Sequence, residues 1–138
     1  TLLSLLDTTA TSMGARLLRN WLHHPLRERA SLNARHEAIA ALLALEQRGV
    51  DAVANVRAQL KQVSDIERIT GRIALRSARP RELAGLRESL QRLPAIAMQL
   101  STADATLLAH LRVDLAFDVE LAHTLQRALQ GGEFELLE

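Results

Sequence analysis

The segment between residues 64 and 93 contains two helix-forming stretches separated by a proline, and this feature limits the fold most. Ile66, Ile69 and Ile73 are spaced three and four residues apart, so they lie along one side of a helix. Pro80 ends that helix, because proline lacks the N–H group that a helix interior needs. Proline is tolerated in a first helical turn, so a second helix is predicted to begin at Pro80. Its apolar side is formed by Leu83, Leu86, Leu90 and Leu93.

Polar residues indicate where the first of these helices begins. Ser64 and Glu67 have the spacing of a capping box, in which a serine and a glutamate each accept a backbone N–H that would otherwise be free. The helix is therefore predicted to begin at Ser64. Gly71 lies within it, where glycine costs about 1 kcal/mol relative to alanine. This glycine either is simply tolerated or permits a close crossing with another helix.

The helical spacing of apolar residues also occurs near the start of the chain. Thr11 or Ser12 can cap a helix, because their side-chain oxygens accept the free N–H groups of a first turn. This helix is predicted to run to about His23. It would place Met13 and Trp21 on one face, as part of the core.

Two more helices are predicted before residue 64. Ser31 caps the first, which carries His36 on its apolar face as a core histidine and ends at Gly49. Residues 53–63 form the second, since valines and a leucine recur there at helical spacing. Residues 1–7 are short and apolar, and they are compatible with a strand, an extended arm or a helical turn.

The region after Pro80 completes the predicted architecture. Pro94 is predicted to kink or end the long helix near Leu93, because the residue before a proline avoids the helical conformation. Asp104 and Asp118 are the candidate caps of two shorter helices. All predicted elements are helices, so the fold class is all-α, and the short linkers suggest an irregular multi-helix bundle.

The helical domain is predicted to span residues 1–130. Gly131 and Gly132 break the last helix, and the EFELLE sequence that follows does not continue its pattern. Residues 131–138 are therefore an atypical tail, compatible with an addition from cloning, and they carry no weight in the functional reasoning.

Composition excludes several classes of function. The chain has no cysteine, so it forms neither disulfides nor thiolate metal sites. Its apolar runs are shorter than the roughly 18 residues that a membrane span needs. It lacks the glycine-rich loop that binds nucleotide phosphates, and the adjacent His23 and His24 diverge too far on a helix to chelate a metal. We therefore expect a cytoplasmic chain that is not an enzyme and holds no metal or cofactor of its own.

Five arginines surround the predicted helix boundary and are the candidate binding residues: Arg68, Arg72, Arg76, Arg79 and Arg81. They can contact DNA phosphates, pair with carboxylates of a neighbouring helix or domain, or simply form a solvated face. Charge is unevenly distributed. Residues 1–98 hold 15 Lys and Arg against 9 Asp and Glu, a balance of +6, whereas residues 99–138 hold 2 against 7, a balance of −5.

Two long sequence elements form a recognisable pattern. The first lies at the start of the chain and is carried by Thr1, Leu2, Leu3, Leu6, Asp7, Thr9, Thr11, Met13, Gly14, Arg16, Leu18, Arg19, Trp21, Leu22, Pro25, Leu26 and Arg27. The second surrounds the helix boundary and is carried by Asp65, Ile66, Glu67, Arg68, Arg72, Ile73, Ala74, Ala78, Pro80, Arg81, Glu82 and Leu83. Together they resemble the core domain of the MutS family of bacterial DNA mismatch-repair proteins. Two long elements in the expected order are more specific than a short motif, and they cover roughly residues 1–100.

The resemblance implies a structural and allosteric core of a longer DNA-repair protein. Such a protein is expected to be a homodimeric, DNA-dependent ATPase whose ATP, Mg²⁺ and mismatch-reading sites lie outside this core. Its implied partners are mismatched double-stranded DNA, bound through the longer protein, other domains of the same polypeptide, and other mismatch-repair proteins. The resemblance also favours carboxylate pairing for the five arginines. The alternative is a free-standing helical adaptor that binds protein partners through leucine-rich faces.

Overall fold

The computed structural model describes residues 1–116 and 119–130, and every regular element within them is a helix. In chain order these are α1 (Leu2–Leu6), α2 (Ser12–His23), α3 (Arg29–Gln47), α4 (Ala52–Leu60), α5 (Ile66–Ala74), α6 (Pro80–Leu100), α7 (Thr106–Asp114) and α8 (Val119–Gln130). The predicted all-α fold is confirmed. Residues 1–7, which the sequence left open, contain the short helix α1.

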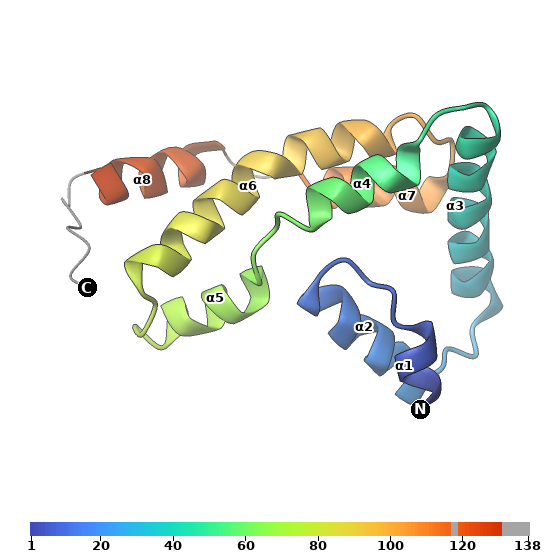
Figure 1. Cartoon of the computed structure of the whole chain (residues 1–138), viewed down its shortest axis with the longest axis horizontal. Coiled ribbons are helices and arrows are strands. Elements are labelled where there is room, and N and C mark those ends of the chain that lie inside the picture. The colour runs from blue at the N-terminus through green and yellow to red at the C-terminus, as the bar shows by residue number, and fades with distance from the viewer. Residues whose placement is uncertain (117–118, 131–138) are drawn as a thin grey trace.

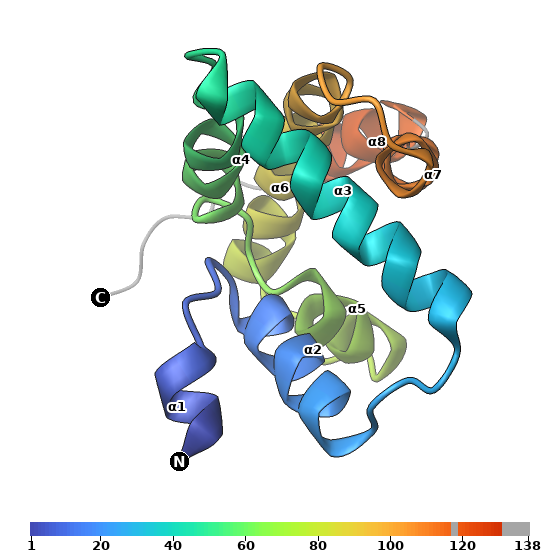
Figure 2. The same cartoon turned by 90° about the vertical axis from the view of Figure 1, so that its right-hand side faces the viewer.

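The longest helix, α6, is the axis around which the others are arranged (Figure 1). α4 and α7 pack beside its C-terminal half, α8 also packs against it, and α5 folds back beneath its N-terminal end. α3 crosses the end formed by α4 and α7. Figure 2 shows α1 and α2 together at the side of α5, away from the packed group of α4, α6 and α7.

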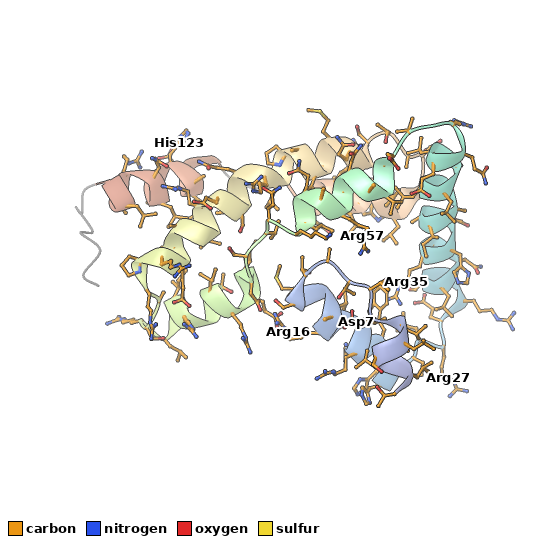
Figure 3. All side chains as sticks on the ribbon, in the orientation of Figure 1. Asp7, Arg16, Arg27, Arg35, Arg57 and His123 are labelled. Atoms are coloured by element: carbon orange, nitrogen blue, oxygen red, sulfur yellow. The ribbon has the colours of Figure 1, made fainter. Side chains whose placement is uncertain are left out.

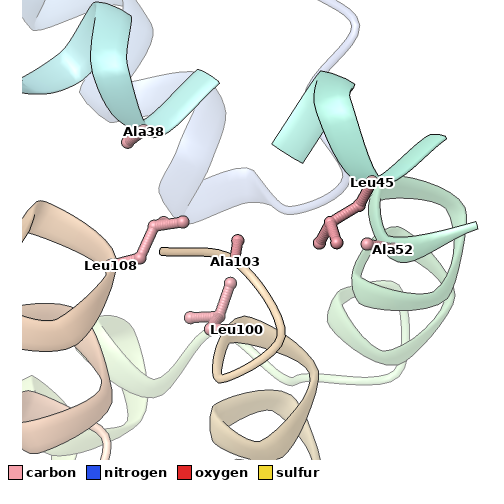
Figure 4. Close-up of a cluster of buried hydrophobic side chains, with 6 residues drawn as sticks. All are labelled: Ala38, Leu45, Ala52, Leu100, Ala103 and Leu108. Carbon is pink, nitrogen blue, oxygen red and sulfur yellow. The ribbon is translucent and has the colours of Figure 1, made fainter. Parts of the chain in front are cut away.

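Two apolar clusters form the core. The larger one, shown in Figure 4, joins α3, α4, α6, α7 and the α6–α7 turn through Ala38, Leu45, Ala52, Leu100, Ala103 and Leu108. The smaller one joins α5 to α6 through Ile69, Leu86 and Leu90. These last three residues belong to the two apolar stripes predicted from the sequence, so the predicted helical spacing is confirmed there.

The two prolines of α6 behave differently. Pro80 is the first residue of the helix, as predicted, and the N–H of Arg79 just before it donates to Oε2 of Glu82 at 2.9 Å. Pro94 does not end the helix near Leu93, because α6 continues to Leu100, so that part of the prediction is wrong. A kink at Pro94 stays a prediction. Pro94 lies on the exposed side of α6, and the buried residues Leu90, Ile96 and Leu100 hold the helix in place on either side of it.

The first residue of α5 differs from the prediction. The N-cap is Asp65, whose Oδ1 accepts the N–H of Arg68 at 3.2 Å. Ser64 stays outside the helix because its own N–H donates to Oγ of the buried Ser89 at 2.9 Å. The carboxylate of Glu67 binds a different partner, so the predicted Ser64–Glu67 capping box is wrong.

The predicted start of α2 is confirmed, whereas that of α3 is wrong. Oγ1 of Thr11 accepts the N–H of Gly14 at 2.9 Å and caps α2. α3 begins at Arg29, two residues before Ser31. The Ser31 hydroxyl donates to Oε2 of Glu28 at 2.7 Å, and no side chain caps the start of α3.

The remaining helix boundaries give mixed results. Gly49 follows the end of α3 with a φ of +79°, the left-handed conformation that favours glycine, and this prediction is confirmed. Asp104 does not cap α7, because the extended residue Ala105 lies between them and takes the N-cap position. Asp118, the other candidate cap, lies outside the described residues.

The apolar face of α2 is not buried. Trp21 keeps 40% of its surface exposed and Met13 is half-buried, so the prediction that both belong to the core is wrong. His36 of α3 is exposed as well, which contradicts its prediction as a core histidine. An amphipathic pattern identifies the apolar side of a helix, but it does not determine whether another element covers that side.

The close approach between elements occurs at Gly85, not at Gly71. A Cβ added at Gly71 would meet no atom within 4 Å, so the idea of a close crossing there is wrong. At Gly85 on α6, an added Cβ would lie 2.8 Å from Oγ of Ser64. The missing side chain therefore lets the segment before α5 pass close to α6.

Replacing Gly71 with alanine is expected to raise the free energy of unfolding by about 0.5–1 kcal/mol, because the site is exposed, helical and open. Gly85→Ala is the matched control: the same gain in helix propensity is offset there by the contact with Ser64. Urea unfolding of the three proteins tests this difference. A loss of stability in Gly71→Ala would contradict it.

Candidate functional site

An arginine on α2 binds two carboxylates at the start of α5. The guanidinium of Arg16 donates to both oxygens of Asp65, with Nη1–Oδ2 and Nη2–Oδ1 distances of 2.8 and 2.7 Å. It also donates to Oε2 of Glu67, at 2.6 Å from Nη2 and 3.2 Å from Nε. Oγ of Ser12 adds a bond of 2.9 Å to Oδ2 of Asp65. We call these four residues the Arg16 joint.

The starts of two helices bring the Arg16 joint together. Because α2 begins at Ser12, this residue and Arg16 are four apart and share one side of the helix. Asp65 caps α5 and Glu67 lies in its first turn, where the helix dipole favours negative charge. Arg16 and Asp65 are 49 residues apart in the chain, so the joint is a tertiary contact.

The Arg16 joint favours the charged forms of Arg16 and Asp65. The Asp65 side chain is 18% exposed, that of Arg16 38%, and that of Glu67 70%. Hydrogen bonds from Arg16 hold the pKa of Asp65 well below its ordinary value, although burial opposes this shift. The bonds to Asp65 and Glu67 in turn raise the pKa of Arg16. This arrangement gives strong, directional binding between two helices, with no group poised to exchange a proton.

Two further polar contacts attach the α1–α2 pair to the other helices. Nη2 of Arg57 on α4 donates to the carbonyl of Thr8 at 2.7 Å. The guanidinium of Arg35 on α3 lies 3.7 Å from the ring centre of Trp21, a cation–π contact. Figure 3 shows Arg16, Arg35 and Arg57 around the α1–α2 pair. Neither α1 nor α2 contains a buried residue, so polar side chains rather than a shared core carry this attachment.

The two sequence elements that carry the family resemblance meet in the Arg16 joint, Arg16 from the first and Asp65 and Glu67 from the second. A family model described as MutS domain III matches residues 1–135. The chain belongs to the MutS domain III family. This domain is a non-catalytic core domain within a family of ATPases of mismatch repair. The match reaches residue 135 and so includes part of the segment that the sequence suggested to be an atypical tail.

In this MutS domain III the five candidate arginines do not form a single row. Nε of Arg68 lies 4.0 Å from Oδ2 of Asp65, and the Arg68 side chain is 77% exposed. Nη1 of Arg72 pairs with Oε1 of Glu82 and so ties α5 to α6. Arg76 follows the end of α5 with a φ of +52°, so the four-residue spacing no longer places it on the helix face.

The structure brings three of the five arginines together. Arg68, Arg72 and Arg81 line a shallow pocket of about 320 Å³ between α5 and α6, whereas Arg76 and Arg79 do not. Within residues 1–116 and 119–130, no ion pair involves Arg76, Arg79 or Arg81. Their contact with another domain or with phosphates stays a prediction.

Over the residues that the structure describes, no three His, Asp or Glu side chains gather as metal ligands would. The helices of that same part include none with the length and apolar character of a membrane span.

Sequence reasoning missed three residues that hold the elements together. Nothing in the helical spacing indicates the partners of Arg16 or Arg57, which lie on other helices. Ser89 is fully buried, accepts the N–H of Ser64 and donates to the carbonyl of Gly85 at 2.6 Å. The available signal was a serine three residues after Leu86, on the apolar side of a predicted helix.

Proposed function

We propose that this chain is the mechanical core of a longer mismatch-repair protein, where it transmits displacement between an ATPase part and a DNA-clamp part. The observation that carries this proposal is the Arg16 joint. It attaches the α1–α2 pair to α5 through charge and hydrogen bonds, whereas the other helices share apolar clusters. Membership of the MutS domain III family supports the mismatch-repair context.

A transmitting domain needs rigid parts and an attachment with more than one arrangement. Close-packed interiors deform little, so the cluster between α3, α4, α6 and α7 supplies the rigid part. A polar attachment can separate without exposing a core, since water replaces its hydrogen bonds. Allosteric coupling then requires that ATP and DNA favour different arrangements of this attachment.

The contacts of α5 give the displacement a route into the longest helix. The Arg16 joint connects α2 to the first turn of α5 through hydrogen bonds, and the Arg72–Glu82 ion pair connects the last turn of α5 to α6. Ile69 packs in the same interface with Leu86 and Leu90. A movement of α2 therefore reaches α6 through α5, and α6 spans most of the packed group (Figure 1).

In the multi-domain protein, Asp65→Asn is expected to weaken the effect of ATP on DNA release by about fivefold or more, the lower range of ordinary allosteric coupling. Affinity for matched duplex without nucleotide should stay within about twofold. DNA dissociation rates with and without ATP, at one stated salt concentration, measure both effects. Asp51→Asn is the control, because Asp51 is also a helix N-cap but its side chain makes no capping hydrogen bond.

The five candidate arginines allow a contrasting outcome. If Arg72→Ala lowers matched-duplex affinity with and without ATP alike, and also reduces the salt dependence of binding, then this residue contacts phosphate. Arg72 would then belong to a DNA-binding surface instead of the transmitting route. We expect Arg72→Ala to impair coupling more than affinity, because Arg72 already pairs with Glu82.

A free-standing helical adaptor is the second candidate function. The observation that favours it is the exposed apolar surface beside α2, which includes Trp21, Ile39 and Leu111. An adaptor would bind a protein partner through the isolated chain, and its α1–α2 attachment would have no effect on any ATP response. Pull-down by the purified chain, combined with the dissociation experiment above, separates the two functions.

A further inference from the structure

An open apolar groove lies between α2, α3 and α7, whose helices face the viewer in Figure 2. Its volume is about 500 Å³, and its lining is mostly leucine, isoleucine and tryptophan side chains. Trp21, Ile39 and Leu111 keep 40%, 54% and 40% of their surfaces exposed. Contiguous exposed apolar surface of this kind marks a binding site more often than scattered residues do. Neither the Arg16 joint nor the arginine pocket shares a lining residue with it.

The elements on one side of this groove carry an excess of positive charge. Residues 17–40, which form most of α2, its connection to α3 and much of α3, contain four arginines and two glutamates. Arg35 itself lines the groove and lies against Trp21. Arg27 and Arg29 form no ion pair with any residue that the structure describes, whereas the charge of Arg19 acts on Asp7. Figure 3 shows Arg27 projecting from the α2–α3 connection. Arg27 and Arg29, together with Arg35, are therefore available to an acidic ligand.

We propose that this groove docks an acidic amphipathic helix of a partner protein, a role separate from transmission. Apolar side chains of the partner, spaced three and four residues apart, would enter between Trp21, Ile39 and Leu111. Its carboxylates would face α3 and the α2–α3 connection, which carry Arg27, Arg29 and Arg35. Duplex DNA matches the charge but not the groove, because phosphates gain nothing from a leucine-lined surface.

The chain carries its own reporter for this binding. Trp21 is the single tryptophan of the sequence, and it lines the groove. A docked helix would remove water from the indole, so the fluorescence maximum of Trp21 is expected to shift to shorter wavelength. The probe is a synthetic helical peptide of about 16 residues, roughly four turns, with leucines along one face and glutamates elsewhere. Titration at low and high salt gives its dissociation constant.

Two altered peptides test the two parts of the chemistry without changing the protein. A peptide with lysine in place of every glutamate is expected to bind at least about tenfold more weakly, a difference of about 1.4 kcal/mol. A peptide with serine in place of the leucines is expected to lose binding. Equal binding of the glutamate and lysine peptides, or no blue shift with any of them, would overturn the proposal.

A pair of substitutions on α7 tests the location. Leu111→Asp, inside the groove, is expected to weaken binding of the glutamate peptide by about tenfold or more, as loss of a central apolar anchor does. Val113→Asp is the matched control: it adds the same charge two residues later at a 72% exposed position outside the groove lining, and should leave binding unchanged. Circular dichroism verifies the helical content of both variants. Ile39→Asp on α3 repeats the test if Leu111→Asp does not fold.

Three other occupants of the groove give distinct results. Competition by duplex DNA for the peptide would assign it to nucleic acid. Self-association of the chain that Leu111→Asp abolishes would assign it to a second copy. Loss of peptide binding when the neighbouring domains of the family are added to the chain would assign it to an intramolecular contact. Each of these results would overturn docking of a partner protein.

Discussion

Replacing Leu100 with alanine is expected to lower the free energy of unfolding by about 2–5 kcal/mol. Leu100 is 7% exposed and lies near the centre of the larger cluster, between Leu108 and Ala52 (Figure 4). Its removal leaves a cavity that helices from four parts of the chain would have to close together. Small domains are stable by only about 5–15 kcal/mol, so this one change removes a large share of the total.

Met98→Ala is the matched control for this substitution. Met98 lies two residues earlier on the same helix and is 70% exposed, so its replacement should change stability by less than about 0.5 kcal/mol. Denaturant unfolding, followed by circular dichroism, measures both variants on one scale. Similar losses in the two variants would show that the cluster around Leu100 does not dominate the stability of the fold.

The parts of the fold that depend on local sequence could be predicted. The apolar stripe of Ile66, Ile69 and Ile73 identifies α5, because helical periodicity is a property of neighbouring residues. Pro80 marks the start of α6, because the missing N–H is a property of one residue. Pro94 shows the limit of this reasoning. Packing on the far side of the helix outweighed the local cost of a proline.

Helix caps could be predicted only in part. The sequence offers Thr11 or Ser12 as the cap of α2, and the structure selects Thr11, while the hydroxyl of Ser12 binds Asp65. At α5, the sequence predicts Ser64 as the cap, whereas the structure has Asp65 there. Contacts from other helices decide between them, since Arg16 and Ser12 bind Asp65 whereas Ser89 holds the N–H of Ser64. Neither contact can be found from spacing along the chain.

The candidate site could be predicted in part. The family pattern includes Arg16, Asp65 and Glu67, but a pattern of matched residues does not say which of them touch. The five arginines are dense in sequence, yet among the described residues it is Arg16 that makes the most hydrogen bonds to carboxylates. Charge density along the chain indicates where ion pairs can occur, and tertiary structure decides which of them form.

The groove shows the same limit for apolar residues. Trp21 lies on the apolar side of α2, as the helical spacing predicts, but other elements cover it only in part and 40% of its surface stays exposed. A helix face that stays apolar and partly uncovered must be stabilised in another way, here by Arg35 stacked on the indole. The polar attachment of α2 and the open groove are therefore consequences of one packing arrangement, in which the α1–α2 pair contributes nothing to either apolar cluster.

Replacing Asp65 with asparagine is expected to lower the free energy of unfolding by about 1–2 kcal/mol at neutral pH, and this loss should disappear in acid. Hydrogen bonds to a charged group contribute about 1.5–3 kcal/mol, and the partial exposure of Arg16 reduces the figure. Asparagine caps helices as well as aspartate does, so the start of α5 is preserved and only the charged attachment is lost. Hydrogen exchange should accelerate most in α2, because the Arg16 joint holds it.

The pH dependence follows from the pKa of Asp65, which the hydrogen bonds from Arg16 lower from the ordinary value of 3.8. A carboxyl whose pKa is lower in the folded state stabilises the fold above its unfolded pKa, and this contribution is lost as pH falls towards the folded pKa. The unfolding free energies of the natural chain and Asp65→Asn should therefore differ most above about pH 5 and converge below 3.8. Asp51→Asn, at the N-cap of α4 where no side-chain capping bond exists, should show a much smaller difference. A constant difference between the natural chain and Asp65→Asn from neutral to acid pH would show that Asp65 acts through packing or capping rather than through its charge.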